Sequence, residues 1–243
     1  MDNSFLTQVS QNVAYVLEFL AIVLMLFLVA YVAEKAAKKK RGDKERILST
    51  RKMAMIGMFS AIAAILHVMD FAVPFAPPFY KLDFSELPTL IGAFAFGPAT
   101  GVMIEFLKIL LKLVFKGTST AFVGDLANFV VGCSFILTAS IIYEFKKTKK
   151  GAVIGCVAGT AAMTIFGTAF NAVYLLPTFA VLYGMDMETI IAMGTKVNAA
   201  ITDVTTLVMF AVAPLNLLKG SLVSLVTLLV YKKLSPILKN GRK

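Results

Sequence analysis

Two polar side chains at the start of the last apolar run form the pair best suited to bind a solute. Asn216 and Lys219 are three residues apart, so they share one face of a helix. An amide both donates and accepts hydrogen bonds, and an ammonium group offers three donors. Together they can recognise carbonyl or hydroxyl groups. The alternative is that Asn216 caps the helix while Lys219 extends its ammonium group towards the membrane surface.

A second amide, Asn171, lies in an apolar run that also contains Phe166, Phe170 and Tyr174. An amide beside aromatic rings suits a planar heteroaromatic ligand, which needs both stacking and hydrogen bonds. A hydrogen bond between two membrane helices would explain the same amide equally well. The residues alone leave both interpretations open.

Further polar groups occupy a segment bounded by prolines, residues 80–88, which contains Asp83, Ser85 and Glu86. Asp83 or Ser85 can cap the helix that follows, with Glu86 in its first turn. Capping is compatible with ligand contact, so all three residues remain candidates for the binding site.

The apolar run that begins after Gly124 carries Asp125 and Asn128 near its start. We expect Asp125 to cap this helix and Asn128 to contact the ligand. The complete set of predicted binding residues is Asp83, Ser85, Glu86, Asn128, Asn171, Asn216 and Lys219.

Lysines recur every four residues at positions 108, 112 and 116, close to Glu105. Residues at this spacing form a stripe on one helix face. The stripe can line a wet interface, pair with Glu105 or extend its ammonium groups to the membrane surface. The sequence does not decide among these, and the stripe stays outside the predicted site.

Residues that would carry out catalysis or bind a metal are not recognisable. The chain has no phosphate-binding loop, no His-Glu-x-x-His motif and no serine nucleophile elbow. Both cysteines, Cys133 and Cys156, lie within apolar runs, where a thiol behaves as a small apolar group. The single histidine, His67, has no Cys or His near it and favours a packed or interfacial role. We predict no enzyme activity, no metal and no resident cofactor.

Composition places these polar groups in a membrane. Of the 243 residues, 58% are hydrophobic and 16% charged, whereas soluble domains average about 45–50% and about 25%. The net charge of +10 does not indicate a nucleic-acid partner, because the cations are clustered beside apolar runs, as in cytoplasmic loops. Such clusters also bind anionic membrane lipid. They fall at residues 35–52, 146–150 and 232–243.

Apolar run length predicts an all-α, polytopic helical bundle with seven spans, each needing about 20 residues when upright. An N-terminal anchor and basic loop occupy residues 1–52, and a six-helix binding domain occupies residues 53–243. Residues 187–213 are expected to form an external excursion with helical content that ends in a partly buried segment, and Pro177 is expected to stop the sixth span. The C-terminus is then cytoplasmic. The predicted spans are 13–32, 53–69, 87–96, 103–115, 122–143, 152–176 and 215–231.

Small residues repeat on the first core span, where Gly57, Ser60, Ala61 and Ala64 form two overlapping pairs four residues apart. Such faces let membrane helices approach closely. They can contact a partner subunit or pack within the chain.

Several motifs resemble those of the riboflavin-specific substrate-binding subunit (S component) of energy-coupling-factor (ECF) transporters. The resemblance extends over about residues 53–238, nearly all the core, while the N-terminal span departs from the usual six-helix pattern. The motifs are Lys81-Leu82-Asp83-Phe84-Ser85-Glu86-Leu87-Pro88, Gly92, Phe96-Gly97-Pro98, Gly124-Asp125 and Asn216 with Lys219.

The resemblance implies a prokaryotic cell-membrane protein that binds riboflavin near the outer face. It also implies partners, namely one transmembrane coupling subunit and two ATPase subunits. By this resemblance, Asn171, Asn216 and Lys219 hydrogen-bond the vitamin, the 83–86 segment closes the site and the small-residue face contacts the coupling subunit. Alternatives are an S component for another vitamin, or a stand-alone ion-coupled carrier that uses Glu105 and the lysine stripe.

Overall fold

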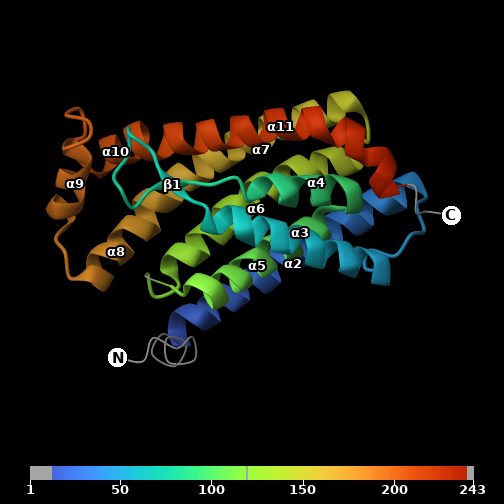
Figure 1. Cartoon of the computed structure of the whole chain (residues 1–243), viewed down its shortest axis with the longest axis horizontal. Coiled ribbons are helices and arrows are strands. Elements are labelled where there is room, and N and C mark those ends of the chain that lie inside the picture. Colours follow the sequence, from blue (N-terminus) through green and yellow to red (C-terminus); the bar gives the residue numbers. More distant parts are fainter. Residues whose placement is uncertain (1–12, 119, 240–243) are drawn as a thin grey trace.

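A computed structural model describes residues 13–118 and 120–239 of the chain. It is a bundle of long helices with one short hairpin (Figure 1). The bundle confirms the all-α membrane fold that the apolar runs predict. In chain order, the elements are α2 (Val13–Arg41), α3 (Thr50–Val68), β1 (Phe71–Ala72), β2 (Lys81–Leu82), α4 (Glu86–Phe96), α5 (Pro98–Lys116), α6 (Val123–Phe145), α7 (Lys149–Phe170), η1 (Asn171–Leu175), α8 (Leu176–Tyr183), α9 (Met187–Thr195), α10 (Val204–Leu207), η2 (Val208–Val212) and α11 (Ala213–Lys239).

Within the described ranges, five helical segments are long and apolar enough to cross a membrane. The predicted total of seven spans also requires α4 and α5. α4 is apolar but has 11 residues, which corresponds to about 16 Å of helix. α5 is longer but carries the lysine stripe. The five segments are 13–41, 50–68, 123–145, 149–183 and 204–231.

The two ends of the bundle differ in character. At one end lie the β1–β2 hairpin and α9, and at the other lie the α2–α3 and α6–α7 connections and the last residues of α11 (Figure 1). The connections carry two of the basic clusters, as short cytoplasmic loops do. By this rule the hairpin end is expected to face outward, and it is called the outer end below. The third basic cluster falls partly on residues 240–243, outside the described residues.

The prediction that Pro177 stops the sixth span was wrong. The helix continues through η1 and α8 to Tyr183. η1 is a π-helical segment, in which the Leu176 N–H bonds to the Asn171 carbonyl five residues back. Pro177 therefore falls in the first turn of a new α-helical stretch, where the missing proline N–H costs little.

The boundary predicted for the last span was also wrong. Residues 204–212 do not belong to an external excursion but form α10 and η2, which run without a break into α11. Asp203 starts this helix, because its carboxylate accepts a 2.8 Å hydrogen bond from the Thr206 N–H in a capping box. As in the sixth span, a π-helical turn precedes a proline, here Pro214. One continuous helix thus replaces two segments. The cytoplasmic location of the C-terminus stays a prediction.

The centre of the bundle is α6, which packs against α2, α4, α5 and α7. α6 and α7 approach each other closely because glycines of α7 face the backbone of α6. A Cβ on Gly155 would lie 2.5 Å from the Ala139 carbonyl oxygen, and one on Gly159 would lie 2.9 Å from the Phe135 carbonyl oxygen. α2 packs on α5 and α6, and its separation as a distinct N-terminal unit stays a prediction.

Gly155→Ala should destabilise the protein by about 1–3 kcal/mol, because the new methyl group meets backbone that cannot move aside. The thermal unfolding midpoint in detergent measures this. The matched control is Gly57→Ala, which meets nothing within 4 Å and should raise stability through its better helix propensity. An unchanged midpoint for Gly155→Ala would contradict the close α6–α7 packing.

Candidate binding site

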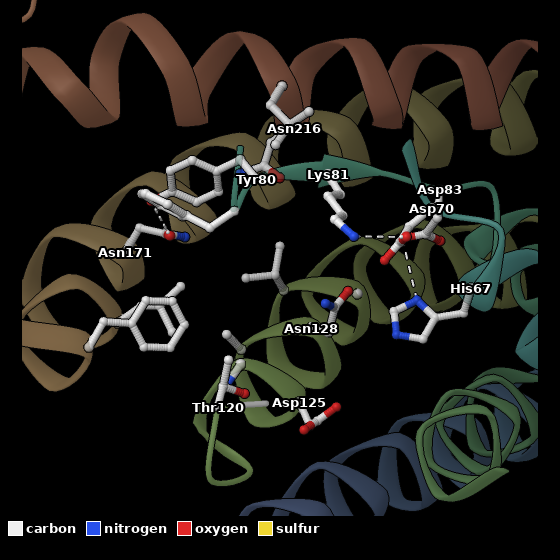
Figure 2. A pocket seen from close by; sticks show the side chains of 18 of the residues that line it. His67, Asp70, Tyr80, Lys81, Asp83, Thr120, Asp125, Asn128, Asn171 and Asn216 are labelled. Carbon is white, nitrogen blue, oxygen red and sulfur yellow. Dashed lines mark hydrogen bonds and ion pairs between the residues drawn. The ribbon is translucent and has the colours of Figure 1, made fainter. Parts of the chain in front are cut away.

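A cavity of about 470 Å³ opens at the outer end of the bundle, within the size range of small-molecule sites. The β1–β2 hairpin covers it, and α6, η1 and α11 form its walls (Figure 2). Its lining comprises His67, Asp70, Phe79, Tyr80, Lys81, Asp83, Glu86, Lys112, Lys116, Thr120, Gly124, Asp125, Ala127, Asn128, Val131, Gly132, Met163, Asn171, Leu175, Phe179, Tyr183, Met185, Ile190, Met193, Leu215, Asn216 and Lys219.

The structure brings six of the seven predicted binding residues to this one cavity, although they come from distant parts of the chain. The exception is Ser85, which is fully buried behind the lining and accepts a 3.0 Å hydrogen bond from the Lys108 ammonium group. The six lining residues are Asp83, Glu86, Asn128, Asn171, Asn216 and Lys219. Whether they contact a ligand stays a prediction.

Lys219 holds two carboxylates at the inner side of the cavity. Its Nζ lies 3.0 Å from Asp83 Oδ2 and 2.7 Å from Glu86 Oε2. All three side chains are less than a tenth exposed. His67 Nδ1 lies 3.4 Å from the same Asp83 oxygen. The lysine therefore neutralises charges from the loop and from α4 while belonging to α11.

The lysine stripe of α5 turns inward, and two of its members neutralise carboxylates on neighbouring elements. Lys108, fully buried, pairs with Glu105 of its own helix and with Glu86 at 3.3 Å. Lys112 Nζ lies 2.6 Å from Asp125 Oδ1 on α6. Of the three interpretations left open by the sequence, pairing with Glu105 holds for Lys108, whereas Lys112 and Lys116 line the cavity.

The third stripe lysine lies at the rim of the cavity. Lys116 pairs at 3.2 Å with Asp70, which also binds Lys81 of the hairpin at 3.1 Å. Both lysines are about two-fifths exposed, so these pairs are screened and contribute little. They nevertheless link the end of α5 to the hairpin that covers the cavity.

The expected helix caps are wrong in detail. Ser85 precedes α4, but its side chain does not cap that helix, and Asp83 instead accepts a 2.8 Å hydrogen bond from the Ser85 N–H. Asp125 does not cap α6, which begins after Phe122 in the left-handed conformation. Its carboxylate binds Lys112 because a buried charge is stabilised more by an opposite charge than by a cap.

The amide groups of the cavity differ in whether their oxygen and nitrogen atoms already have hydrogen-bond partners in the protein. Asn171 Oδ1 accepts a 2.9 Å hydrogen bond from the Tyr80 hydroxyl, and Asn171 Nδ2 donates to the Gly167 carbonyl at 2.7 Å. Within residues 13–118 and 120–239, the side chains of Asn128 and Asn216 make no hydrogen bond to the protein. These two amides are therefore the groups most available to a ligand.

The aromatic rings predicted to stack on a ligand do not line the cavity. Phe166, Phe170 and Tyr174 stack on one another, with ring centroids 5.6 and 5.0 Å apart. Their four-residue spacing places them on a single face of the helix, and Asn171 faces another direction. The rings that line the cavity are those of Phe79, Tyr80, Phe179 and Tyr183.

Asp83 lies in the loop before α4, and its pKa reflects its partners. Burial alone would raise the pKa of this carboxyl, but the Lys219 ammonium group and the nearby His67 ring outweigh burial. The pKa is held well below its ordinary range, so Asp83 is ionised at neutral pH. Among the described residues, no group of His, Cys, Asp and Glu is arranged to hold a metal ion.

Comparison with known proteins agrees with this geometry. Residues 51–231 match the family model for the ECF transporter, substrate-specific component. The chain belongs to this family. The match begins after α2, so the N-terminal helix lies outside the part that defines the S component.

Relatives and a solved structure extend the similarity of this S component. The riboflavin transporter RibU of Staphylococcus aureus is 34% identical over 196 residues, covering 81% of this chain and 96% of the relative. The riboflavin transporter FmnP of Bacillus subtilis is 30% identical, covering 80% and 97%. The structure described as the S component of a bacterial ECF transporter has a TM-score of 0.61 at 36% identity, covering 77% and 97%. The S component is accordingly a multi-pass cell-membrane protein.

Lys219→Met should destabilise the S component by about 3–5 kcal/mol, because Asp83 and Glu86 would lose their shared buried cation. Chemical or thermal unfolding in detergent measures the loss. Lys81→Met is the control, since its pair with Asp70 is exposed and its removal should cost little. Equal effects of the two substitutions would contradict the proposed role of the buried network.

Acid should weaken the fold through Asp83. Because the pKa of Asp83 is depressed in the folded state, its stabilisation is complete above the unfolded-state value of about 3.9 and is lost as the pH falls further. The stability difference between the natural protein and Asp83→Asn should therefore stay constant from neutral pH to about pH 5 and shrink below about pH 4. A difference that shrinks already near neutrality would show that Asp83 is not strongly paired.

Proposed function

We propose that this S component binds riboflavin in the outer cavity and takes it up together with an ATP-driven ECF module. The observation that carries the proposal is the cavity itself, which offers unpaired amides and aromatic walls at the outer end of a family-defined bundle. The relatives named as riboflavin transporters support the choice of vitamin. Because the role is capture of an unmodified vitamin, no catalytic group or resident cofactor is required.

The chemistry of the cavity suits an uncharged flavin. The ring system of riboflavin presents carbonyl groups and an imide N–H, which the amides of Asn128 and Asn216 can pair with. Its ribityl chain carries hydroxyls, and its planar rings fit beside Phe179 and Tyr183. Asn171 acts mainly through Tyr80, which it holds over the cavity.

The remaining predicted contacts divide into direct and indirect roles. Lys219, Asp83 and Glu86 line the cavity as an already neutralised cluster, so each can accept or donate one further hydrogen bond without leaving a charge unpaired. Ser85 acts from behind them by holding Lys108. We therefore assign Ser85 to support of the site and the other three to its surface.

Uptake requires energy from outside this chain, because the sequence has no phosphate-binding loop. We assign this task to a transmembrane coupling subunit with two ATPase subunits. On α3, Gly57 and Ala61 are small and exposed. Ser60 and Ala64 are buried within the chain. The contact with the coupling subunit is assigned to the Gly57 and Ala61 face.

A stand-alone ion carrier has less support. Such a carrier would use Glu105 and the lysine stripe as a charge relay, but these lysines are engaged in fixed pairs with Glu86, Asp125 and Asp70. The nearest alternative is that the cavity binds another vitamin of similar size. Competition binding against riboflavin distinguishes the two ligands.

The purified protein should carry a flavin absorbance spectrum or bind added riboflavin with quenching of its fluorescence. Asn216→Ala should weaken binding about tenfold, which corresponds to about 1.4 kcal/mol, because one buried hydrogen-bond partner is lost. Leu217→Ala, one position along and 53% exposed, is the matched control and should bind normally. A protein that neither carries nor binds riboflavin would overturn the proposed function.

Ala61→Leu should leave riboflavin binding unchanged and reduce uptake in cells that express the complete ECF module. The bulky side chain would keep a partner helix from approaching α3. The control is Ala161→Leu, which places the same bulk on an exposed position of α7. If Ala61→Leu reduces binding, or if both variants transport normally, the assigned partner face is wrong.

A further inference from the structure

The N-terminal helix α2 lies outside the family match, yet it is anchored to the core at its inner end. Glu34, fully buried, accepts a 3.1 Å hydrogen bond from the Ala99 N–H in the first turn of α5. The carboxylate occupies the space beside Gly97, where a side chain would collide with it. Arg41, at the end of α2, pairs with Glu144 near the end of α6. The helix is therefore attached to the core by specific polar contacts in addition to being embedded in the membrane.

The outer end of α2 is anchored to the wall of the cavity. Glu18 Oε2 accepts a 3.0 Å hydrogen bond from the Tyr174 hydroxyl in η1. Tyr174 lies between Asn171 and Leu175, and both of these line the cavity. A carboxylate at membrane depth is costly unless it has a partner, so this contact is specific.

Apolar contacts accompany the hydrogen bond. Phe19 of α2 is 3% exposed and packs edge-on against Phe129 of α6, with ring centroids 5.4 Å apart. Tyr15 packs on the cluster that contains Ala127 and Leu175, two cavity-lining residues. The outer turns of α2 thus lie directly behind α6 and η1.

We propose that α2 is a positioning helix for the binding cavity, with Glu18 as its positioning residue. Through Tyr174, Glu18 holds the η1 segment in place, and with it Asn171 and the Tyr80 side chain that Asn171 binds. η1 is a π-helical turn, a rare form that occurs frequently at functional sites. The choice of riboflavin as the probe rests on the proposed function.

Dissociation of riboflavin tests this role. Glu18→Ala and Tyr174→Phe should each release riboflavin about threefold to tenfold faster, because the wall loses one charge-assisted hydrogen bond. Combining the two substitutions should add nothing further, since both remove the same bond. Glu18→Gln should restore slow release, because an amide oxygen still accepts from the tyrosine. The control is Leu24→Ala, on the lipid-facing side of α2 and 69% exposed, which should release riboflavin normally.

A second measurement needs no ligand. Amide hydrogen exchange over residues 167–176 should be faster in Glu18→Ala than in the natural protein, and unchanged in Leu24→Ala. If riboflavin does not bind at all, the proposed function fails while the exchange result still decides the role of α2. Unchanged exchange in Glu18→Ala overturns the positioning role. So does additivity of the two substitutions, or failure of Glu18→Gln to restore slow release.

Discussion

The outer half of the molecule depends on buried charges that neutralise one another within the bundle. Lys219 is shared by Asp83 and Glu86, and Lys108 by Glu86 and Glu105. These groups come from the loop, α4, α5 and α11, so neutralisation is possible only when those elements meet in one arrangement. An uncompensated member would cost several kcal/mol. The network therefore fixes the shape of the cavity as strongly as apolar packing does, and in lipid, where burial of apolar surface between helices gains little, it has few substitutes.

Neutralised charges also determine what the cavity can recognise. Because the buried carboxylates already have lysine partners, a ligand with its own charge would have to break a pair on entry. The amides of Asn128 and Asn216 carry no such cost, and each can donate and accept. The cavity thus favours a neutral molecule rich in hydrogen-bonding groups. Tyr80, held by its hydrogen bond to Asn171, adds an aromatic ring to the same lining.

Helix positions could be predicted from the sequence because hydropathy and charge act over whole runs of about 20 residues. The same argument selected seven polar residues, because a polar group beside an apolar run is costly without a partner, and six of them line the cavity. The pairing of those groups was not accessible, because Lys219 and Asp83 are 136 residues apart and their contact follows from packing. The π-helical turns were missed because nothing in local composition marks them, and without them Pro177 and Pro214 look like helix ends. The direction of the Phe166, Phe170 and Tyr174 face depends on the same packing.

The N-terminal helix shows how an element outside the family match can pack on the core. Most of α2 faces outward, and its buried positions form a narrow seam that includes Phe19, Val23, Ala30 and Ala37. Apolar contact alone would not fix the depth of such a helix, because lipid solvates its surface equally well. Hydrogen bonds towards both ends fix the depth of α2. Glu34 accepts one from the Ala99 N–H at the start of α5, and Glu18 accepts one from the Tyr174 hydroxyl in η1. Since each carboxylate has a single hydrogen-bond partner, a shift of α2 by one turn would break both bonds. The position of α2 is therefore fixed along its axis, and its outer anchor falls on the element that carries Asn171.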